Sequence, residues 1–363
     1  MTIAHLAAGS VADKVSHAGV WLDGAIGFVT LSGLVLGIVY RRTHDRTGAV
    51  PYCKVLRRAR LLYLIQLVTL VLALTVSAVS VRDVGVGRPE QFGGWASALA
   101  QVATMRLPVQ YVDVLPMYVV LLLAAVPALA LLSRSRPVVL LALSVAVYVV
   151  ATVWPHIAVP PGVHFNWFAW QLPFVVGLTV GWHWDSRGVA ARMRSRPLVV
   201  AAAAVAAACF LTAQAFGRLD VMGDSELDSL VGAGFTKYNL GPAHILFGFA
   251  AMAVGYAAVS ALRDAGHLRA VRAWFALLGS RSLDAFVILC LAVIVLPAVL
   301  RYQTSSATAM ALVVVTLGVQ TAWVVLRRRG YLPGLATGTA VPARPLPGPV
   351  SRAVSRGRTS STR

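Results

Sequence analysis

Long apolar runs constrain the fold of this chain more than any other feature of its sequence. Nine runs are long enough to cross about 30 Å of hydrocarbon as helices. They cover residues 24–40, 61–81, 114–132, 137–154, 167–184, 198–216, 240–262, 283–300 and 307–326. Each is longer than the roughly 10 residues of a transmembrane barrel strand, so all are expected to be helices.

Composition supports the same class of protein. Charged residues make up only 12% of the 363 residues and hydrophobic residues 58%, with a mean hydropathy of +0.75. Soluble domains carry about 25% charged residues. The sequence therefore predicts an all-α, polytopic integral membrane helix bundle over residues 1–326, followed by a tail. The tail, 327–363, is basic and rich in Pro, Gly and Ser, a composition typical of a disordered segment.

The distribution of charge predicts an orientation. If the loop after Tyr40 is cytoplasmic, that side of the membrane holds 25 of the 32 Lys and Arg residues, whereas 9 of the 13 acidic residues face outward. This asymmetry follows the positive-inside rule and places the C-terminus in the cytoplasm. The net charge of +19 is then explained by topology and by attraction to anionic membrane lipids, and no nucleic-acid partner is expected.

The same orientation places Met1 outside the membrane, although the first residues lack the pattern of a signal peptide. One further helix before His5 would give a cytoplasmic N-terminus and ten spans. We expect in-frame codons before Met1 to encode about 20 residues with an apolar run that ends at His5. The alternative is a nine-span protein with its N-terminus outside. The three cysteines have no metal-ligand or disulfide spacing, so no metal is expected.

Five short segments carry a family resemblance. Residues 28–42 follow the pattern F-x-x-L-S-G-x-x-x-G-x-x-Y-x-R, and residues 113–122 follow D-x-L-P-x-Y-x-x-L-L. Residues 165–171 are similar to F-N-P-x-A-W-Q, with Trp167 in place of proline. Residues 237–242 follow K-x-N-L-G-P, and residues 278–283 follow L-G-x-x-S-L. In this order the segments resemble the OpgC family, integral-membrane acyltransferases related to the acyltransferase-3 group.

The resemblance implies an activity and a catalytic residue. Members transfer a succinyl or similar acyl group from acyl-CoA, a co-substrate rather than a bound cofactor, to glucans or another cell-envelope polysaccharide. In the family the first membrane helix ends in a functional histidine, and His5 stands at that position. Neutral imidazole is suited to take a proton from a sugar hydroxyl near neutral pH. Asp113 is a candidate to orient the ring, with a helix N-cap as its alternative role.

Polar residues at the predicted outer ends of helices are candidates for the glycan acceptor site, because such groups near membrane depth usually face a cavity or one another. The candidate residues are Asn166, Trp170, Gln171, Lys237 and Asn239. Each has a simpler alternative. Asn166 could cap a helix, Gln171 could form an interhelical hydrogen bond, Trp170 could belong to the interfacial aromatic belt, and Lys237 could be a loop charge.

Basic residues before the second predicted helix are candidates for the acyl-CoA donor site. Arg57, Arg58 and Arg60 match the basic stretch that the family shows there, and arginine binds phosphate through paired hydrogen bonds. The alternative is that these charges only set topology. For the whole protein, a multi-pass transporter or exporter of a polar or glycan substrate and a truncated, inactive relative stay open.

Overall fold

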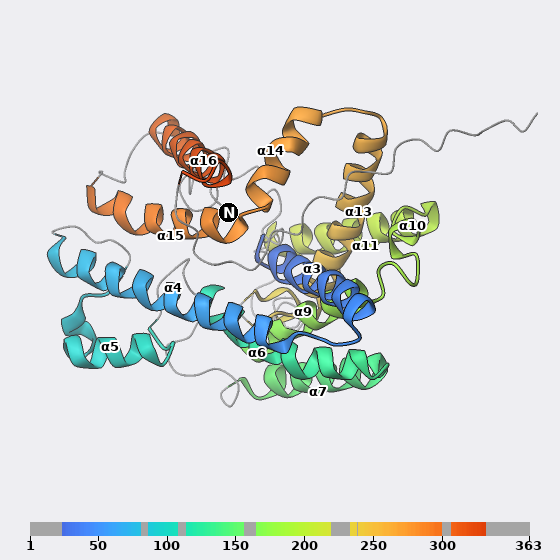
Figure 1. Ribbon diagram of the computed structural model, residues 1–363, viewed down its shortest axis with the longest axis horizontal. Coiled ribbons are helices and arrows are strands. Elements are labelled where there is room, and N and C mark those ends of the chain that lie inside the picture. The colour runs from blue at the N-terminus through green and yellow to red at the C-terminus, as the bar shows by residue number, and fades with distance from the viewer. Residues whose placement is uncertain are drawn as a thin grey trace, which may run out of the picture. The chain divides into compact units, whose positions relative to one another are not determined.

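The computed structural model describes residues 24–80, 86–107, 114–155, 165–218, 233–237, 239–299 and 306–331. Within these residues every regular element is a helix, as the apolar runs predict (Figure 1). His5 and Asp113 lie outside the described residues, as does the tail beyond Tyr331.

Each of the nine predicted segments corresponds to a helix. These helices are α3 (Gly24–Thr47), α4 (Tyr52–Val79), α6 (Val114–Ser133), α7 (Pro137–Val153), α9 (Trp167–Trp182), α11 (Arg196–Arg218), α13 (Pro242–Asp264), α15 (Ser282–Val299) and α16 (Ser306–Arg328). Shorter elements not predicted from the sequence are η1 (Pro89–Phe92), α5 (Trp95–Ala103), α10 (Val189–Arg192) and α14 (Arg269–Gly279).

Several of these helices are long and apolar, as in a multi-pass membrane protein, although not all nine have the length of a full membrane span. By length and hydropathy five helices of the described residues qualify as membrane spans, namely α3, α4, α6, α13 and α16. The pair α14–α15, bent by 82°, raises the number to six if it is counted as one span. Helix α7 has 17 residues and is therefore about 26 Å long, shorter than the hydrocarbon layer. Nine spans and their sidedness stay predictions.

The start of α4 differs from the predicted boundary. The helix begins at Tyr52 rather than at residue 61, so Arg57, Arg58 and Arg60 lie inside its first turns and not ahead of it. The segment between Tyr52 and Leu61 is rich in Arg, Leu and Lys, which are strong helix formers, so helix propensity extends the helix beyond its apolar part. Arg58 therefore lies on a rigid element.

Helices α3 and α9 approach each other through reciprocal glycines, two on each helix at a spacing of four residues. These are Gly33 and Gly37 on α3 and Gly177 and Gly181 on α9. A Cβ atom on Gly33 would lie 2.1 Å from the carbonyl oxygen of Phe174, and one on Gly177 would lie 2.2 Å from that of Thr30. Only glycine lets the two backbones come this close, as in small-xxx-small contacts between membrane helices.

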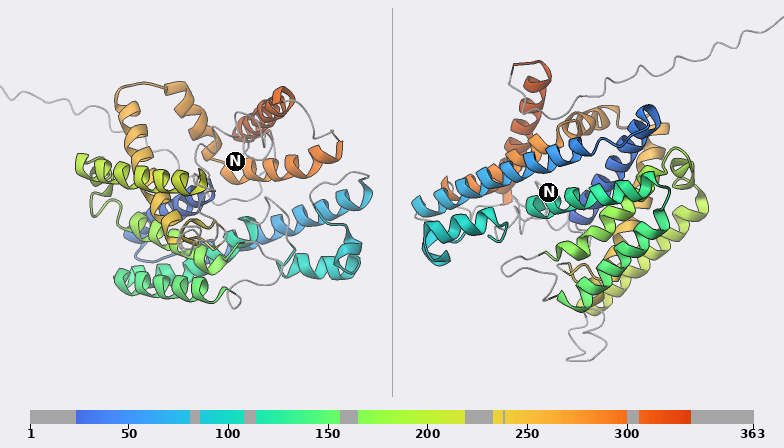
Figure 2. Two further views of the ribbon diagram at one scale, coloured as in Figure 1. Left: turned by 180° about the vertical axis from the view of Figure 1, so that it is seen from behind. Right: turned by 60° about the horizontal axis from the view of Figure 1, so that its bottom comes forward.

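The remaining helices pack in neighbouring pairs. Helix α4 packs against α6 and runs alongside α15, α7 packs against α9, and α11 packs against α13 (Figures 1 and 2). An ion pair between Asp284 and Arg327, whose side chains are 4% and 2% exposed, joins α15 to α16. In addition, Gln320 Nε2 donates a hydrogen bond to the Ala285 carbonyl at 2.9 Å.

We predict that Gly33→Ala destabilises the protein strongly, because the added methyl group would meet backbone atoms of α9 that cannot move aside. Gly27→Ala is the matched control on α3, since a Cβ there meets nothing within 4 Å. We expect Gly27→Ala to be neutral or slightly stabilising, because alanine favours helix by about 1 kcal/mol. Thermal unfolding of both purified variants in detergent measures the difference. Equal stability of the two variants would contradict the close contact.

Candidate functional site

A cleft lies among four helices, α3, α4, α6 and α15. Its lining residues are Phe28, Ser32, Arg58, Leu62, Val114, Leu115, Tyr118, Ser282, Leu283 and Phe286. The lining is mostly apolar, and its polar and charged groups are the three hydroxyls of Ser32, Tyr118 and Ser282 and the guanidinium of Arg58. Such a combination is typical of a small-molecule site, in which apolar walls hold the ligand and a few polar groups orient it.

Aromatic side chains from three helices form one wall of the cleft. The Phe28 ring lies 5.6 Å from that of Tyr118 and 6.1 Å from that of Phe286. The Arg58 guanidinium lies 5.8 Å from the centre of the Tyr118 ring. A cation in this position over an aromatic face is attracted to it, which restricts where the Arg58 side chain can lie. The charge of Arg58 is thus held beside the cleft.

Three of the family-like segments meet in this cleft. Phe28 and Ser32 come from the first segment, Tyr118 from the second, and Ser282 and Leu283 from the last. Val114, which also lines the cleft, directly follows Asp113 in the chain. Segments near opposite ends of the described chain therefore contribute to one surface.

The cleft also joins residues that the charge pattern assigns to opposite sides of the membrane. Arg58 follows the basic loop predicted to be cytoplasmic, whereas Val114 begins a helix predicted to start at the outer side. The start of α4 thus lies beside the start of α6, which does not fit the alternating orientation that the charge pattern predicts for these two helices. Arg58, a predicted donor residue, and Val114, the residue after Asp113, therefore line the same cleft.

One face of α7 holds the other two family-like segments. Its residues Ser144, Tyr148 and Ala151 have helical spacing and hydrogen-bond three different partners. Ser144 bonds both amide atoms of Gln171, donating through Oγ to Oε1 at 2.7 Å and accepting from Nε2 at its carbonyl at 2.7 Å. Tyr148 donates its hydroxyl to the Leu240 carbonyl at 2.8 Å.

Asn166 serves as the cap of α9 and as a link to α7. Its Nδ2 donates to the Ala151 carbonyl at 2.8 Å, and its Oδ1 accepts from the backbone N–H of Ala169 at 3.1 Å. The side chain is fully buried. The structure therefore gives Asn166 the capping role that the sequence offered as its simpler alternative, and gives Gln171 the interhelical hydrogen bond.

Of the other predicted acceptor residues, Trp170 is buried and two are accessible. Trp170 is fully buried and its ring meets that of Phe165 edge-on at 5.5 Å. Lys237 is exposed and Asn239 is half-buried, both in the turn before α13. That turn needs glycine at Gly241, where a Cβ would lie 2.1 Å from the Gly234 carbonyl oxygen. None of these side chains lines the cleft.

The comparison with protein families supplies the identification. Residues 1–330 match the family model of the OpgC protein. The chain belongs to the OpgC family. No curated protein and no solved structure matched it. Membership in the OpgC family implies an acyltransferase role of the kind that modifies glucans, with an acyl donor and a glucan acceptor.

Among the three donor arginines predicted for this OpgC protein, only Arg58 lines the cleft. Arg57 and Arg60 are exposed on other faces of α4. Sequence reasoning missed Phe28, Tyr118 and Phe286 as site residues, because an aromatic residue in an apolar run is usually part of a helix interface. The signal that could have found two of them is their place within the family-like segments, Phe28 in the first and Tyr118 in the second.

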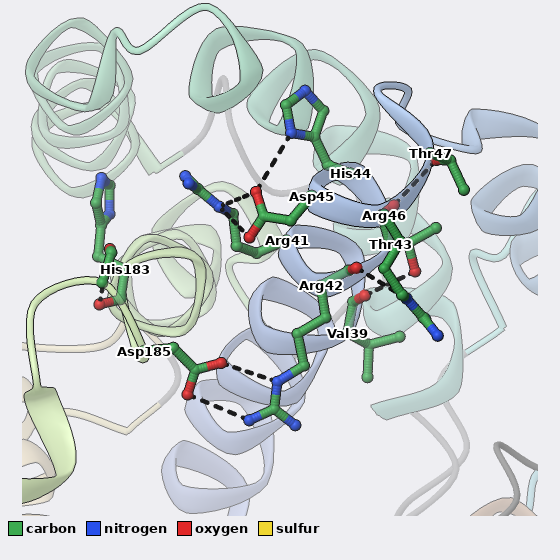
Figure 3. Close-up of polar contacts among 11 residues, drawn as sticks. Val39, Arg41, Arg42, Thr43, His44, Asp45, Arg46, Thr47, His183 and Asp185 are labelled. Carbon is green, nitrogen blue, oxygen red and sulfur yellow. Dashed lines mark hydrogen bonds and ion pairs between the residues drawn. The ribbon is translucent and has the colours of Figure 1, made fainter.

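A polar cluster at the C-terminal end of α3 fixes this helix to the turn after α9 (Figure 3). Arg42 Nε and Nη2 donate to the carboxylate of Asp185 at 2.9 and 3.2 Å. Arg41 bonds Asp45 on its own helix, with its guanidinium 5.5 Å from the Trp182 ring. The hydrogen bond from Arg42 holds the pKa of Asp185 below its usual range. The stabilisation from this pair is therefore present at neutral pH and is lost as the pH falls through that lowered pKa.

We predict that Gln171→Met lowers thermal stability by about 1–3 kcal/mol, because it leaves the Ser144 groups of α7 without their partner. Ser144→Ala and the double variant complete a cycle that isolates the interaction. A strong coupling energy in thermal unfolding, with unchanged acceptor KM below the unfolding temperature, is the expected result. A raised acceptor KM without coupling would instead assign Gln171 to the substrate.

Proposed function

We propose that this protein transfers a succinyl or similar acyl group from acyl-CoA to a hydroxyl of an extracytoplasmic glucan or another cell-envelope polysaccharide. One observation supports this proposal most strongly: three OpgC-like segments and Arg58 meet in a single cleft. Arg58 and Val114, the residue after Asp113, line this same cleft, as a site that joins a donor to an acceptor requires.

His5 is proposed as the general base. It takes the proton from the sugar hydroxyl while the hydroxyl oxygen attacks the thioester carbon. The carbon–sulfur bond then breaks, and the thiolate of CoA leaves and receives the proton from the imidazolium. Asp113 is proposed to orient the imidazole and to stabilise its charged form. Val114, the residue after Asp113, lines the cleft, which supports a catalytic centre close to it.

Arg58 is proposed as the main donor-binding residue. Its guanidinium beside the Tyr118 ring can pair with phosphate oxygens of acyl-CoA through two hydrogen bonds. The apolar and aromatic wall formed by Phe28, Tyr118 and Phe286 lies beside the proposed donor site and keeps water away from it. Arg57 and Arg60 are assigned a smaller, electrostatic contribution because they are exposed outside the cleft.

Lys237 and Asn239 are proposed to contact the acceptor, since they are the accessible members of the predicted acceptor group. Asn166 and Gln171 are proposed to hold the acceptor side in place through α7, and Trp170 to support them from the interior of the protein. The acceptor side thus consists of accessible polar groups in front of a satisfied hydrogen-bond network, which keeps their positions fixed.

We predict that cells without the protein lose an O-acyl substituent from an envelope glycan, detected by mass spectrometry of extracted glycans. Restoring the wild-type protein returns the substituent, whereas His5→Ala inserts normally in the membrane but does not restore it. Asp113→Asn lowers the rate more than it lowers expression. Full restoration by His5→Ala would refute the assigned base. Unchanged acylation with altered uptake or export of small molecules would favour a transporter.

We predict that Arg58→Gln raises the apparent KM for acyl-CoA by about tenfold or more, the loss expected for a hydrogen-bonded contact to a charged group worth about 1.5–3 kcal/mol. Arg57→Gln and Arg60→Gln are matched controls, because they remove the same charge from the same helix outside the cleft. Each control is expected to change KM less than Arg58→Gln. Equal effects of all three variants would show that only the net charge of this surface matters.

A further inference from the structure

Gln66 is a buried polar side chain near the middle of α4. It is 0% exposed. Neither Oε1 nor Nε2 has a hydrogen-bond partner in the part of the chain that the structure describes. In a membrane-spanning helix an unsatisfied amide is costly, and polar residues at this depth usually serve a function.

Other buried amides of the described residues differ from Gln66. Gln171 uses both polar atoms in bonds to Ser144, and Gln320 donates to the Ala285 carbonyl. Hydroxyls on α4 are also satisfied, since Thr69 donates to the Ile65 carbonyl and Ser77 to that of Val86. Trp167 Nε1, Trp170 Nε1 and Thr179 Oγ1 are also buried without a hydrogen-bond partner among the described residues, but each is a single atom, whereas both polar atoms of the Gln66 amide lack one.

The position of Gln66 connects it to the cleft. Arg58, Leu62 and Gln66 follow one another at four-residue intervals and so lie along one face of α4. The first two line the cleft. Gln66 is the next residue on this face, one turn beyond Leu62 and about 12 Å along the helix from Arg58.

We propose that Gln66 hydrogen-bonds an amide of the pantetheine arm of the acyl donor, a proposal that rests on acyl-CoA being the donor. Arg58 then holds the phosphates, and the arm follows the same face of α4 past Leu62 toward Gln66. The pantetheine arm contains two secondary amides, and a primary amide can donate to the carbonyl and accept from the N–H of such a group. A neutral partner also avoids placing a further charge at membrane depth.

This role separates ligand binding from stability. Gln66→Met keeps the length of the side chain and removes both hydrogen-bonding atoms. Because the folded chain gives these atoms no partner, their removal does not lower stability and can raise it. Gln320→Met is the matched control, a buried membrane glutamine whose Nε2 has a partner, so it is expected to lower stability.

The test compares two ligands on the purified full chain in detergent. One is free coenzyme A, and the other is its nucleotide half, which carries the phosphates but lacks the pantetheine arm. We expect Gln66→Met to weaken coenzyme A binding roughly three- to tenfold, to leave nucleotide binding unchanged, and to unfold at the wild-type temperature or above. We expect Gln320→Met to bind both ligands with wild-type affinity and to unfold at a lower temperature. We expect Arg58→Gln to bind both ligands more weakly.

Each other outcome has a defined meaning. If Gln66→Met binds coenzyme A as tightly as the wild type, the proposal is overturned, and water or the acceptor glycan is then the partner of Gln66. The assignment of acyl-CoA as the donor is not affected by this outcome. An equal loss of affinity for both ligands also overturns it, because the effect would then not concern the arm. If the wild-type chain binds neither ligand, the assignment of acyl-CoA as donor fails, and the proposal for Gln66 fails with it.

Discussion

Close backbone contact between α3 and α9 is the interaction on which the rest of the structure depends. The glycines at 33, 37, 177 and 181 let the two helices pack without intervening side chains. In a membrane, helices gain little from apolar burial alone, so van der Waals contact over a smooth surface becomes a main source of association. Helix α3 carries Phe28 and Ser32 into the cleft, while α9 carries Asn166 and Gln171 onto α7. The contact therefore fixes the donor cleft relative to the proposed acceptor side.

Hydrogen bonding divides the polar residues of the bundle into two groups. Asn166 and Gln171 are fully used by the protein and act as links between helices. Arg58 lines the cleft, and Gln66 is buried without a hydrogen-bond partner among the described residues. A membrane protein loses stability for every polar group it leaves without a partner, so groups of the second kind are expected where a ligand completes them. The donor side, with Arg58 and Gln66 on one face of α4, has this character.

The positions of the helices could be predicted from the sequence, because an apolar run must lie in the hydrocarbon and must satisfy its backbone internally. The ends of the helices could not, as α4 shows. Its first turns are basic but strongly helix-forming, so hydropathy starts the predicted helix nine residues too late, at residue 61 instead of Tyr52. The short helices α5 and α14 escaped prediction for the related reason that each has too few apolar residues to form a membrane span by itself.

The site was harder to predict than the fold because its residues meet only through tertiary contacts. From its residue type and its predicted depth, Gln171 was a candidate to line a polar acceptor pocket. In the structure both polar atoms of its amide are hydrogen-bonded to Ser144 on the neighbouring helix α7. Gln66 drew no attention in the sequence, since a single glutamine in an apolar run is equally compatible with an interhelical bond. Gln171 and Gln66 differ in whether a neighbouring helix places a hydrogen-bonding group within reach of the side-chain amide. That depends on helix packing, to which the glycines of α3 and α9 contribute. The F-x-x-L-S-G segment carries Gly33 together with Phe28 and Ser32, so it contributes to helix packing as well as to the lining of the cleft.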